Sequence, residues 1–392
     1  MIPAEFNIVD WGLIAVLGAT FLAQMYFYIR YLAAPMRQLR RAQKQEPATI
    51  DQPVSVLVSA RNAGTLLREY LPALLTQDYP EYEVIVVDDG SEDDTRDVIE
   101  QYMTVYPRLH MTFVPKGARV GSTKKLALTL AAKAAQYDYL LLTDADCVPE
   151  SNHWIREMMS GFADQRQALS RNDQRPIDLV LGFGAYFYER GAVNRIVRYD
   201  TLFNGLHYLG AALCGHPYMG VGRNLAYRKS LFFESGGFSH LMTNTAGDDD
   251  LFVNHVATPQ NTAVVLSPES YTWSPSKTTM RDWWQQKRRH LSVSPAYRPQ
   301  TKRRLVVEPL TRGLFYAAVI YIAVSYQLSV VSLIAAGLFL LRWLTQLWII
   351  NVSARRMHLH GFGPLAILGL DIWLPLVNLW MLIVPNRKKK KW

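Results

Sequence analysis

The chain has 392 residues, of which 49% are hydrophobic and 19% charged, so disorder as the main state is excluded and the length suits one large domain or two ordinary ones. Lys and Arg outnumber Asp and Glu by 42 to 33, which gives a net charge of +9. Only two cysteines occur, Cys147 and Cys214, which excludes a disulfide framework and indicates a reducing compartment for the working part.

Residues 11–32 form an apolar run of membrane-spanning length, interrupted only by Gln24 and by Arg30 near its end. A cleaved signal peptide is the competing interpretation, but Glu5 and Asp10 stand where a basic start is expected. More basic residues follow the run: Arg37, Arg40, Arg41 and Lys44. Because basic flanks stay on the cytoplasmic side, we expect a transmembrane helix that leads into the cytoplasm.

The next part of the chain alternates short strand patterns with helical patterns. The strand patterns are apolar, rich in β-branched residues, and fall at 54–60, 83–89, 109–115 and 137–146. Helical patterns separate them at 65–77, 93–106 and 122–136. This alternation predicts an α/β domain with a parallel sheet, whose ligands bind beyond the carboxyl ends of the strands.

Acidic pairs stand at two of these strand ends. Asp88 and Asp89 end the second strand, where a helix cap does not explain both of them, and they could bind a base edge or ribose hydroxyls. Asp144 and Asp146 end the fourth strand, and two like charges so close call for a cation between them. Oxygen ligands of this kind favour Mg²⁺ or Mn²⁺ shared with substrate phosphates.

Three further carboxylates, Asp248 to Asp250, open an apolar segment. Some of them serve as a solvated helix start, and crowding raises the proton affinity of one, as a general base requires. The segment 283–290 then carries two tryptophans and a basic run. We expect Trp283 and Trp284 at the level of lipid headgroups, and Arg288 or Arg289 on a diphosphate.

A second basic stretch could also meet phosphates, although lysines at a helix start are common: Lys116, Arg119, Lys124 and Lys125. No complete G-x-x-x-x-G-K-[ST] loop occurs in the sequence, so ATP chemistry of the P-loop type is not supported.

The apolar block 313–351 is too long for one span, since a helix rises about 1.5 Å per residue through a core of about 30 Å. Two helices turning near 325–329 fit it. A further span through 361–384 would strand the basic residues 387–391 outside, so we expect a re-entrant or interface-lying segment there. Alternatively, 313–325 lies flat and only two spans follow. Basic residues that flank apolar runs indicate a membrane protein and not a nucleic-acid-binding one.

Taken in order, these motifs resemble the family 2 glycosyltransferases, membrane-bound inverting enzymes with a GT-A type domain that include ceramide glucosyltransferases and processive synthases. The matching segments are VSARN at 58–62, 77–95 around VDDGS, TDADC at 143–147, GDDDL at 247–251, and Q-x-x-R at 286–289. The resemblance implies an α/β GT-A nucleotide-sugar domain with a mostly parallel sheet, flanked by transmembrane helices. The expected division is a membrane helix (1–34), a basic cytoplasmic linker (35–52), the GT-A domain (53–300) and a membrane region of two or three segments with a basic tail (301–392).

The resemblance also implies roles for single residues. Around the nucleotide it puts Ala60, Arg61, Asp88 and Asp89, with Lys125 approaching it. On the metal and the diphosphate it puts Asp144 and Asp146.

For the chemistry, the resemblance assigns the catalytic base to Asp248, with Asp249 as the fallback, because the usual Glu of the family's E-D motif is Gly247 here. The Q-x-x-R-W signature provides Gln286 and Arg289, but His290 replaces its Trp. The segment 220–227 resembles the acceptor-side loop of these enzymes.

The expected reaction moves a sugar from a nucleotide-diphosphate sugar, for which we expect a UDP-sugar, to a lipid or lipid-linked hydroxyl on the cytoplasmic face. Mg²⁺ or Mn²⁺ is the expected cofactor. We expect an integral membrane protein, located in the inner membrane if the source is bacterial. Nucleic acid is not an expected partner. A processive polysaccharide synthase is the alternative within the same chemistry. A non-catalytic nucleotide-sugar-binding scaffold is the alternative of another class, and it predicts the loss of an acidic motif, whereas none is lost.

Overall fold

The computed structural model describes residues 8–42, 50–115, 121–163, 176–242, 246–326 and 329–384. The chain divides into two compact units. We call residues 1–36 with 297–392 the helical unit, and residues 37–296 the sheet unit.

The sheet unit is built on a seven-stranded sheet with the order β3-β2-β1-β4-β8-β6-β9. Its strands are β1 Val54–Ala60, β2 Tyr82–Asp88, β3 Leu109–Phe113, β4 Tyr139–Asp144, β6 Leu179–Leu181, β8 Leu225–Arg228 and β9 Thr262–Val264. All neighbouring pairs are parallel except those of β8, which runs antiparallel to both β4 and β6. The predicted α/β class with a mostly parallel sheet is therefore confirmed, and the four predicted strands are β1 to β4.

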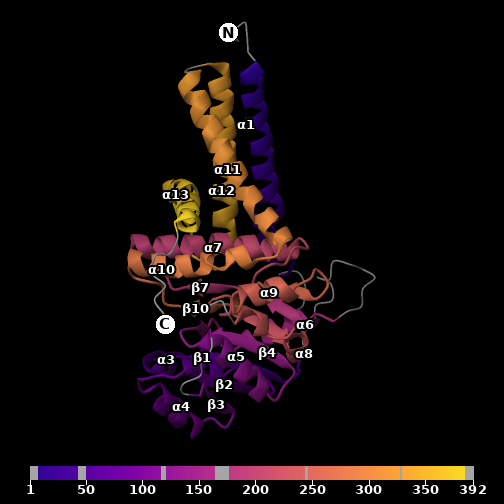
Figure 1. The fold of residues 1–392 in the computed structure, drawn as a ribbon, viewed down its shortest axis with the longest axis vertical. Helices are drawn as coiled ribbons and strands as arrows, with labels where there is room; N and C mark the ends of the chain where they lie inside the picture. Colours follow the sequence, from indigo (N-terminus) through magenta and orange to yellow (C-terminus); the bar gives the residue numbers. More distant parts are fainter. Residues whose placement is uncertain are drawn as a thin grey trace. The chain divides into compact units, whose positions relative to one another are not determined.

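Helices cover both faces of this sheet, because its central strands β1, β2 and β4 are buried at nearly every position. The predicted helices are α3 Gly64–Leu75, α4 Thr95–Met103 and α5 Thr123–Ala134 (Figure 1). Val56 and Val58 of β1 share one core with Leu67 of α3, Val98 of α4 and other residues of this face. On the other face α5 packs across β1, β2 and β3. Burial on both faces is what parallel strands require.

In the described residues, the second half of the sheet unit adds a three-stranded sheet and five α-helices. The small sheet has the order β5-β10-β7, formed by β5 Val148–Pro149, β10 Thr272–Ser274 and β7 Gly184–Tyr186. The helices are α6 Trp154–Ala163, α7 Ala192–Leu213, α8 Lys229–Glu234, α9 Asp250–Val256 and α10 Met280–Leu291. Asn224 joins these parts, since its amide accepts a hydrogen bond from the Trp154 indole and donates to the carbonyls of Phe183 and Ser270.

Within the described residues, four helices are long and apolar enough to cross a membrane, and they form most of the helical unit. The first combines α1 Ile8–Phe27, a π-helical turn Tyr28–Leu32 and α2 Ala34–Ala42. The others are α11 Pro299–Ser325, α12 Val330–Arg356 and α13 Pro364–Ile383. The break between α11 and α12 falls where the sequence predicts a turn, although α11 begins well before the apolar block. The basic tail 387–391 lies outside the described residues.

Three of these helices lie side by side, and the fourth does not follow them (Figure 1). Leu17 of α1 shares an apolar cluster with Phe315 and Ile322 of α11, so residues 313–325 run along α1. Arg356 at the end of α12 donates to the carbonyl of Met36 at 2.7 Å, so α12 ends at the same level as the first helix. In Figure 1 α13 is strongly foreshortened, so its axis is steeply inclined to the other three.

A buried polar network ties the four helices together. Asp371 of α13 accepts hydrogen bonds from Arg312 of α11 (2.9 Å), and from Arg342 (2.9 Å) and Gln346 (2.8 Å) of α12. Gln24 of α1 accepts from Arg342 at 3.1 Å and donates to the carbonyl of Glu308 at 3.1 Å. Charged groups at such depth require partners of this kind, because the bilayer core offers no water.

Candidate active site

The acidic pairs meet at one edge of the large sheet, because the parallel strands end in register. Ala60 of β1 lies opposite Asp88 of β2, and Ser59 of β1 lies opposite Asp144 of β4. Asp89 continues this edge, since its N–H donates to the carbonyl of Ala60 at 2.8 Å. Asp88 and Asp144 are 56 residues apart in the sequence. They therefore lie on either side of the end of β1.

A single ammonium group connects this edge to the third acidic motif. The Nζ atom of Lys124, near the start of α5, lies 2.9 Å from Asp144 Oδ1 and 3.1 Å from Asp248 Oδ2. Asp248 stands directly before α9, 104 residues after Asp144. A cation between two carboxylates offsets their mutual repulsion. The structure thus brings the β4 tip and the α9 start to one site.

Asp248 and Asp249 have different surroundings, although they are neighbours in sequence. Burial acts to raise the pKa of Asp248, but the Lys124 ammonium outweighs it, so this pKa is lowered. Burial and the charge of Asp248 raise the pKa of Asp249. The carboxylate of Asp249 accepts from the N–H groups of Gly222 (2.7 Å) and Asp250 (2.8 Å). Crowding therefore raises the proton affinity of Asp249 and not that of Asp248.

Gly247 occupies the position at which the related motif carries Glu, and the backbone explains the difference. Its φ angle is +85°, a conformation that side chains rarely adopt. A Cβ atom there would lie 2.6 Å from the Leu251 side chain. Glycine is therefore the residue that allows this chain to turn sharply before Asp248.

The residues after β4 have the donor set of a cation site. Asp144, Asp146 and Cys147 offer ligand atoms that all lie within 4.8 Å of one another. Burial and the nearby charge of Asp144 raise the pKa of Asp146, which a bound cation would reverse. Burial also raises the pKa of the Cys147 thiol to about 12, so the two carboxylates are the effective ligands. Oxygen ligands fit Mg²⁺ or Mn²⁺.

Other strand tips carry polar side chains along the same edge of the sheet. Asp89 is buried, its Oδ2 accepts from the Thr123 hydroxyl at 2.7 Å, and its Oδ1 has no hydrogen-bond partner within the described residues. Burial raises the pKa of Asp89. Asp88 Oδ1 accepts from the N–H of Ser91 at 2.9 Å, which shapes the loop, and Arg61 is exposed at the end of β1. Asp89 therefore has one carboxylate oxygen free for a ligand donor.

Lys125 has a different position from its neighbour Lys124. Its side chain is fully buried, and its Nζ atom donates to the carbonyls of Leu241 (2.8 Å) and Ala246 (2.7 Å). It thus holds the segment before Asp248 in place. The lysine that reaches the acidic cluster is Lys124, whereas Lys125, which the resemblance puts near the nucleotide, is bonded to backbone carbonyls. Lys116 and Arg119 of the same basic stretch lie outside the described residues.

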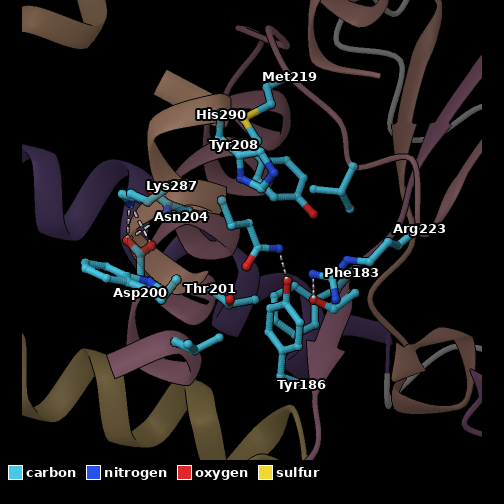
Figure 2. A pocket seen from close by; sticks show the side chains of 15 residues that line it. Phe183, Tyr186, Asp200, Thr201, Asn204, Tyr208, Met219, Arg223, Lys287 and His290 are labelled. Atoms are coloured by element: carbon cyan, nitrogen blue, oxygen red, sulfur yellow. Dashed lines mark hydrogen bonds and ion pairs between the residues drawn. The ribbon is translucent and has the colours of Figure 1, made fainter. Parts of the chain in front are cut away.

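A cavity of about 100 Å³ lies between α7, α10, β7 and the loop 219–223, and we call it the α7–α10 cavity (Figure 2). Gln286 lines it and donates to the Tyr186 hydroxyl at 3.0 Å. His290, at the position of the motif's Trp, also lines it. Gly222 belongs to the cavity's loop and donates to Asp249, so the cavity adjoins the acidic site.

The remaining residues of α10 are divided between its two faces. Trp283 is buried and lines the α7–α10 cavity, so it does not lie on the surface, where the sequence led us to expect a headgroup anchor. The reason is the helical repeat, since Trp283 and Lys287 are four residues apart and share the buried face. Arg289 is exposed and does not line the cavity.

Comparison with known families decides the assignment of the chain. The sequence profile described as glycosyl transferase family 21 matches residues 19–386, which is nearly the whole length. The chain belongs to glycosyl transferase family 21. The match supports the predicted glycosyltransferase class, and family 21 is the family that it shows.

Relatives with curated descriptions match parts of the chain. The probable glycosyltransferase YdaM of Bacillus subtilis is 25% identical over 243 residues, which are 60% of this chain and 54% of that protein. The β-monoglucosyldiacylglycerol synthase of Trichormus variabilis is 27% identical over 142 residues, 36% of this chain and 29% of that protein. The chain spans about half the length, or less, of these relatives.

Among solved structures, a mannosyltransferase of Pyrobaculum calidifontis in complex with GDP-Man and Mn²⁺ has a similar fold. Its TM-score is 0.53 at 20% identity, and the match covers 91% of this chain and 99% of that one. Structure neighbours of this kind are GT-A glycosyltransferases, so the predicted GT-A fold is confirmed.

Some residues around the site had no signal of their own in the sequence. Arg223 lies in the segment 220–227 and stacks on the Tyr186 ring at 4.3 Å, and its guanidinium donates to the Gly184 carbonyl at 3.0 Å. Asp200 and Asn204 of α7 line the cavity but belong to no motif. Only the resemblance of 220–227 to an acceptor-side loop pointed to this region.

Proposed function

We propose that this family 21 protein is a membrane-bound, inverting, metal-dependent glycosyltransferase. It transfers a sugar from a nucleotide-diphosphate sugar, with UDP as the nucleotide, to a lipid hydroxyl on the cytoplasmic face of the membrane. In this mechanism it resembles the family 2 enzymes whose motifs it carries.

The observation that carries the proposal is the convergence on Lys124. Asp144 and Asp248 lie 2.9 and 3.1 Å from the same ammonium, although they are 104 residues apart in the sequence. Asp146 lies within 4.8 Å of Asp144 by its ligand atoms. A carboxylate pair suited to a cation therefore stands next to a carboxylate suited to proton transfer, as glycosyl transfer requires.

On the donor side, Ala60, Arg61, Asp88 and Asp89 would surround the nucleotide. The free Oδ1 of Asp89 is available to accept an N–H of the base. Asp144 and Asp146 would hold Mg²⁺ or Mn²⁺, and a bound divalent cation offsets charge on a departing diphosphate. The mannosyltransferase with the similar fold was solved with Mn²⁺ and a nucleotide sugar, which supports this donor class. We propose that Lys124, and not Lys125, contacts the diphosphate. Gln286 and Arg289 would lie on the acceptor side of the diphosphate.

The transfer itself is a single displacement. The acceptor oxygen forms a bond to the anomeric carbon while the bond to the diphosphate oxygen breaks, and the hydroxyl proton passes to Asp248. Asp248 is ionised beside Lys124, but its lowered pKa makes it a weaker base than Asp249, so its assignment rests on its position beside Lys124 and on the motif and not on its proton affinity. Asp249 is the fallback, but its two backbone hydrogen bonds favour a structural part for it.

The membrane helices support a lipid acceptor on the cytoplasmic side. Arg37, Arg40 and Arg41 follow the first span, and Arg355 and Arg356 end α12 at the same level of the helical unit. Basic ends mark the cytoplasmic side. The relative that makes β-monoglucosyldiacylglycerol supports a lipid product.

A processive polysaccharide synthase remains the second candidate, because the poly-β-1,6-N-acetyl-D-glucosamine synthase of Staphylococcus epidermidis is 28% identical over 123 residues. Four helices, one of them inclined to the rest, offer little room for a channel.

The test uses the full chain in detergent with a panel of radiolabelled nucleotide sugars and a membrane-lipid extract, with Mn²⁺, Mg²⁺ or EDTA. We expect a labelled lipid, formed only when a divalent cation is present. Labelled polymer would support the second candidate. If the protein catalyses no sugar transfer and no donor hydrolysis, the result would support the non-catalytic scaffold.

The base assignment is tested with Asp248→Asn, which keeps the shape of the side chain but removes the acceptor of the proton. We expect donor affinity within about threefold of wild type and a fall in kcat of about 100-fold or more, the scale of a lost general base. Normal turnover by this variant would reject the assignment, and the same loss in Asp249→Asn alone would move it to Asp249.

A further inference from the structure

The side chain of Arg223 has no role in the proposed function, although it makes several contacts with the small sheet. Its guanidinium donates to the carbonyls of Gly184 (3.0 Å) and Ala185 (3.1 Å) of β7 and to the Ser274 hydroxyl of β10 at 3.2 Å. It also lies over the Tyr186 ring, 4.3 Å from the centroid (Figure 2). A planar group with N–H donors in a rigid fork suits a set of fixed acceptors. These contacts therefore hold Arg223 in one direction.

The small sheet leads directly to the turn that carries the carboxylates of the cation site. Its strand β10 pairs with β5, which begins immediately after Cys147. The N–H of Cys147 donates to the carbonyl of Asp144 at 3.0 Å and closes this turn. The Cys147 thiol is buried, and its Sγ atom lies 3.0 Å from Ser274 Oγ. The hydroxyl that accepts from Arg223 therefore also touches the turn.

These contacts form a chain of hydrogen bonds that runs in one direction. Arg223 can only donate, so the Ser274 hydroxyl accepts from it and retains its own proton for Cys147 Sγ. The Cys147 thiol in turn donates to Asp146 Oδ1 at 3.4 Å. The chain thus runs from the guanidinium to one oxygen of the Asp146 carboxylate.

A chain of this kind fixes the direction of a metal ligand. Partners that hydrogen-bond to ligating carboxylates orient them, and their loss typically costs about 10–100-fold in metal affinity. A carboxylate offers about four lone-pair directions, so a hydrogen bond to Oδ1 of Asp146 leaves the others for a cation.

We propose that Arg223 is a positioning residue of the cation site, which acts through Ser274 and Cys147 to hold the Asp146 carboxylate in direction for Mg²⁺ or Mn²⁺. This inference rests on the proposed function and adds to its cation site a residue that does not touch the ion. It also gives the small sheet a part in the site, because β7 and β10 hold the guanidinium in place.

Charge and position predict opposite results for the loss of Arg223. Burial and the charge of Asp144 raise the pKa of Asp146, and the Arg223 guanidinium acts against them, so its charge reaches this carboxylate. A positive charge so near disfavours a second cation. If charge were the whole effect, removal of the guanidinium would strengthen cation binding. If Arg223 positions Asp146, its removal weakens cation binding.

The experiment titrates Mn²⁺ into the full chain in detergent, with and without UDP, and measures free Mn²⁺ by electron paramagnetic resonance. Asp146→Asn shows how much of the binding belongs to this site. Arg223→Gln removes the charge and the fork, whereas Arg223→Lys keeps the charge and loses only the fork. Ser274→Ala removes the middle hydroxyl of the chain.

Arg228→Lys is the matched control. Arg228 stands five residues further along, at the end of β8, and lies over the Tyr139 ring at 4.9 Å. It also donates to a backbone carbonyl, that of Ile177, at 3.3 Å. The control therefore loses the same kinds of contact without a link to the cation site.

We expect Arg223→Gln and Arg223→Lys each to weaken Mn²⁺ binding by about tenfold or more, and Ser274→Ala to weaken it as well. The double variant of Arg223→Lys with Ser274→Ala should bind no more weakly than Arg223→Lys alone, because both residues act through one chain. The spectrum of the bound ion at saturating Mn²⁺ should change in these variants, since it depends on the arrangement of the ligands. Arg228→Lys should bind as wild type does.

Wild-type or tighter Mn²⁺ binding by either Arg223 variant would overturn the proposal. So would additive losses in the double variant, or an equal loss in Arg228→Lys, which would indicate a general effect on the fold. Melting temperatures show which variants are folded, and Ser274→Ala still decides if both Arg223 variants unfold. If wild type binds no Mn²⁺ with or without UDP, the cation site of the proposed function fails together with this inference. If only Asp146→Asn loses binding, the inference fails alone.

Discussion

Lys124 and Lys125 show how much depends on one step along a helix. Successive residues of an α-helix point about 100° apart, so two neighbouring lysines cannot share a direction. Ser122 caps α5 and thereby fixes which of them faces the acidic cluster. Lys124 contacts Asp144 and Asp248, whereas Lys125 is bonded to two backbone carbonyls.

The two lysines should therefore respond differently to substitution by Met. Lys124→Met removes a cation from two carboxylates at the surface of the site, so we expect donor affinity or kcat to fall by about tenfold or more with little change in melting temperature. Lys125→Met leaves two buried carbonyls without a donor and should lower the free energy of unfolding by about 1–3 kcal/mol. Calorimetry and donor titration measure both effects. Lys133→Met, on the exposed face of α5, is the control, and identical behaviour of the first two variants would contradict this assignment.

Gly247 allows a second prediction at this scale. Gly247→Glu restores the residue of the related E-D motif, but it forces a side chain into φ +85° and against Leu251. We expect a loss of at least about 1 kcal/mol in unfolding free energy and slower transfer, because Asp248 moves with the turn. A thermal melt and a transfer assay measure this. An active, equally stable variant would mean that the turn tolerates the motif's residue.

The positions of single site residues could be predicted from the sequence where a local pattern, such as a buried strand, precedes them. Asp88 and Asp144 follow buried strands, so their position at one sheet edge follows from strand polarity. Asp200 and Lys287 are 87 residues apart on two helices, and no spacing relates them. The choice between Lys124 and Lys125 depended on where the helix cap falls, which a basic stretch does not reveal.

At the scale of elements, α10 depends on its first turn. Thr279 accepts a hydrogen bond from the N–H of Asp282 at 3.1 Å and donates its own hydroxyl to the Asp282 carboxylate at 2.7 Å. This cap satisfies donors that a helix start leaves unpaired. Gln286 and Lys287 on this helix form one wall of the α7–α10 cavity, so the cap supports that wall.

Removal of either helix cap should show that α10 supports acceptor binding and that α5 supports donor binding. Thr279→Ala should cost about 1 kcal/mol of stability, the usual value of an N-cap, and raise the KM for the acceptor with little effect on donor affinity. Ser122→Ala removes the cap of α5 and should act on donor affinity instead, because α5 carries Lys124. Initial rates at varied donor and acceptor concentrations measure both. A common effect of the two variants on one substrate would refute the division.

Strands differed in how well the sequence revealed them, because their length and surroundings differ. The strands β1 to β4 were predicted because each has five to seven apolar, β-branched-rich residues. The strands β6 and β9 have three residues each and β8 has four, too few to show a period. Their place in the sheet is set by long-range packing, such as the hydrogen bonds of Asn224 to Phe183 and Ser270.

At the scale of the whole molecule, the helical unit relies on charged groups in an apolar setting. Arg342 and Asp371 are fully buried, and Arg312 is nearly so. Asp371 is a carboxylate within the apolar helix α13, and its partners come from other helices, so the sequence could not predict them. Their pairing is what makes such residues tolerable in a membrane.

Asp371→Leu should destabilise the helical unit by about 3–5 kcal/mol, because it leaves the buried Arg342 guanidinium without its carboxylate and Arg312 with Glu308 alone. Thermal unfolding in detergent, followed by limited proteolysis between α12 and α13, measures the loss. The quadruple variant that also carries Arg312→Leu, Arg342→Leu and Glu308→Leu should regain most of it, since none of these charges is then left without a partner. If the single variant unfolds as wild type does, the network contributes little to stability.

The position of Asp371 near the C-terminus has a consequence for biogenesis. α13 follows α11 and α12 in the chain, so during synthesis Arg342 enters the lipid before Asp371 exists, whereas Arg312 already has Glu308 on its own helix. Until then the nascent protein holds the Arg342 guanidinium without its carboxylate in a medium that disfavours it, and the arrival of the last helix completes the insertion. Premature termination anywhere before Asp371 should therefore direct the product to membrane quality control, even when the entire sheet unit has already been translated.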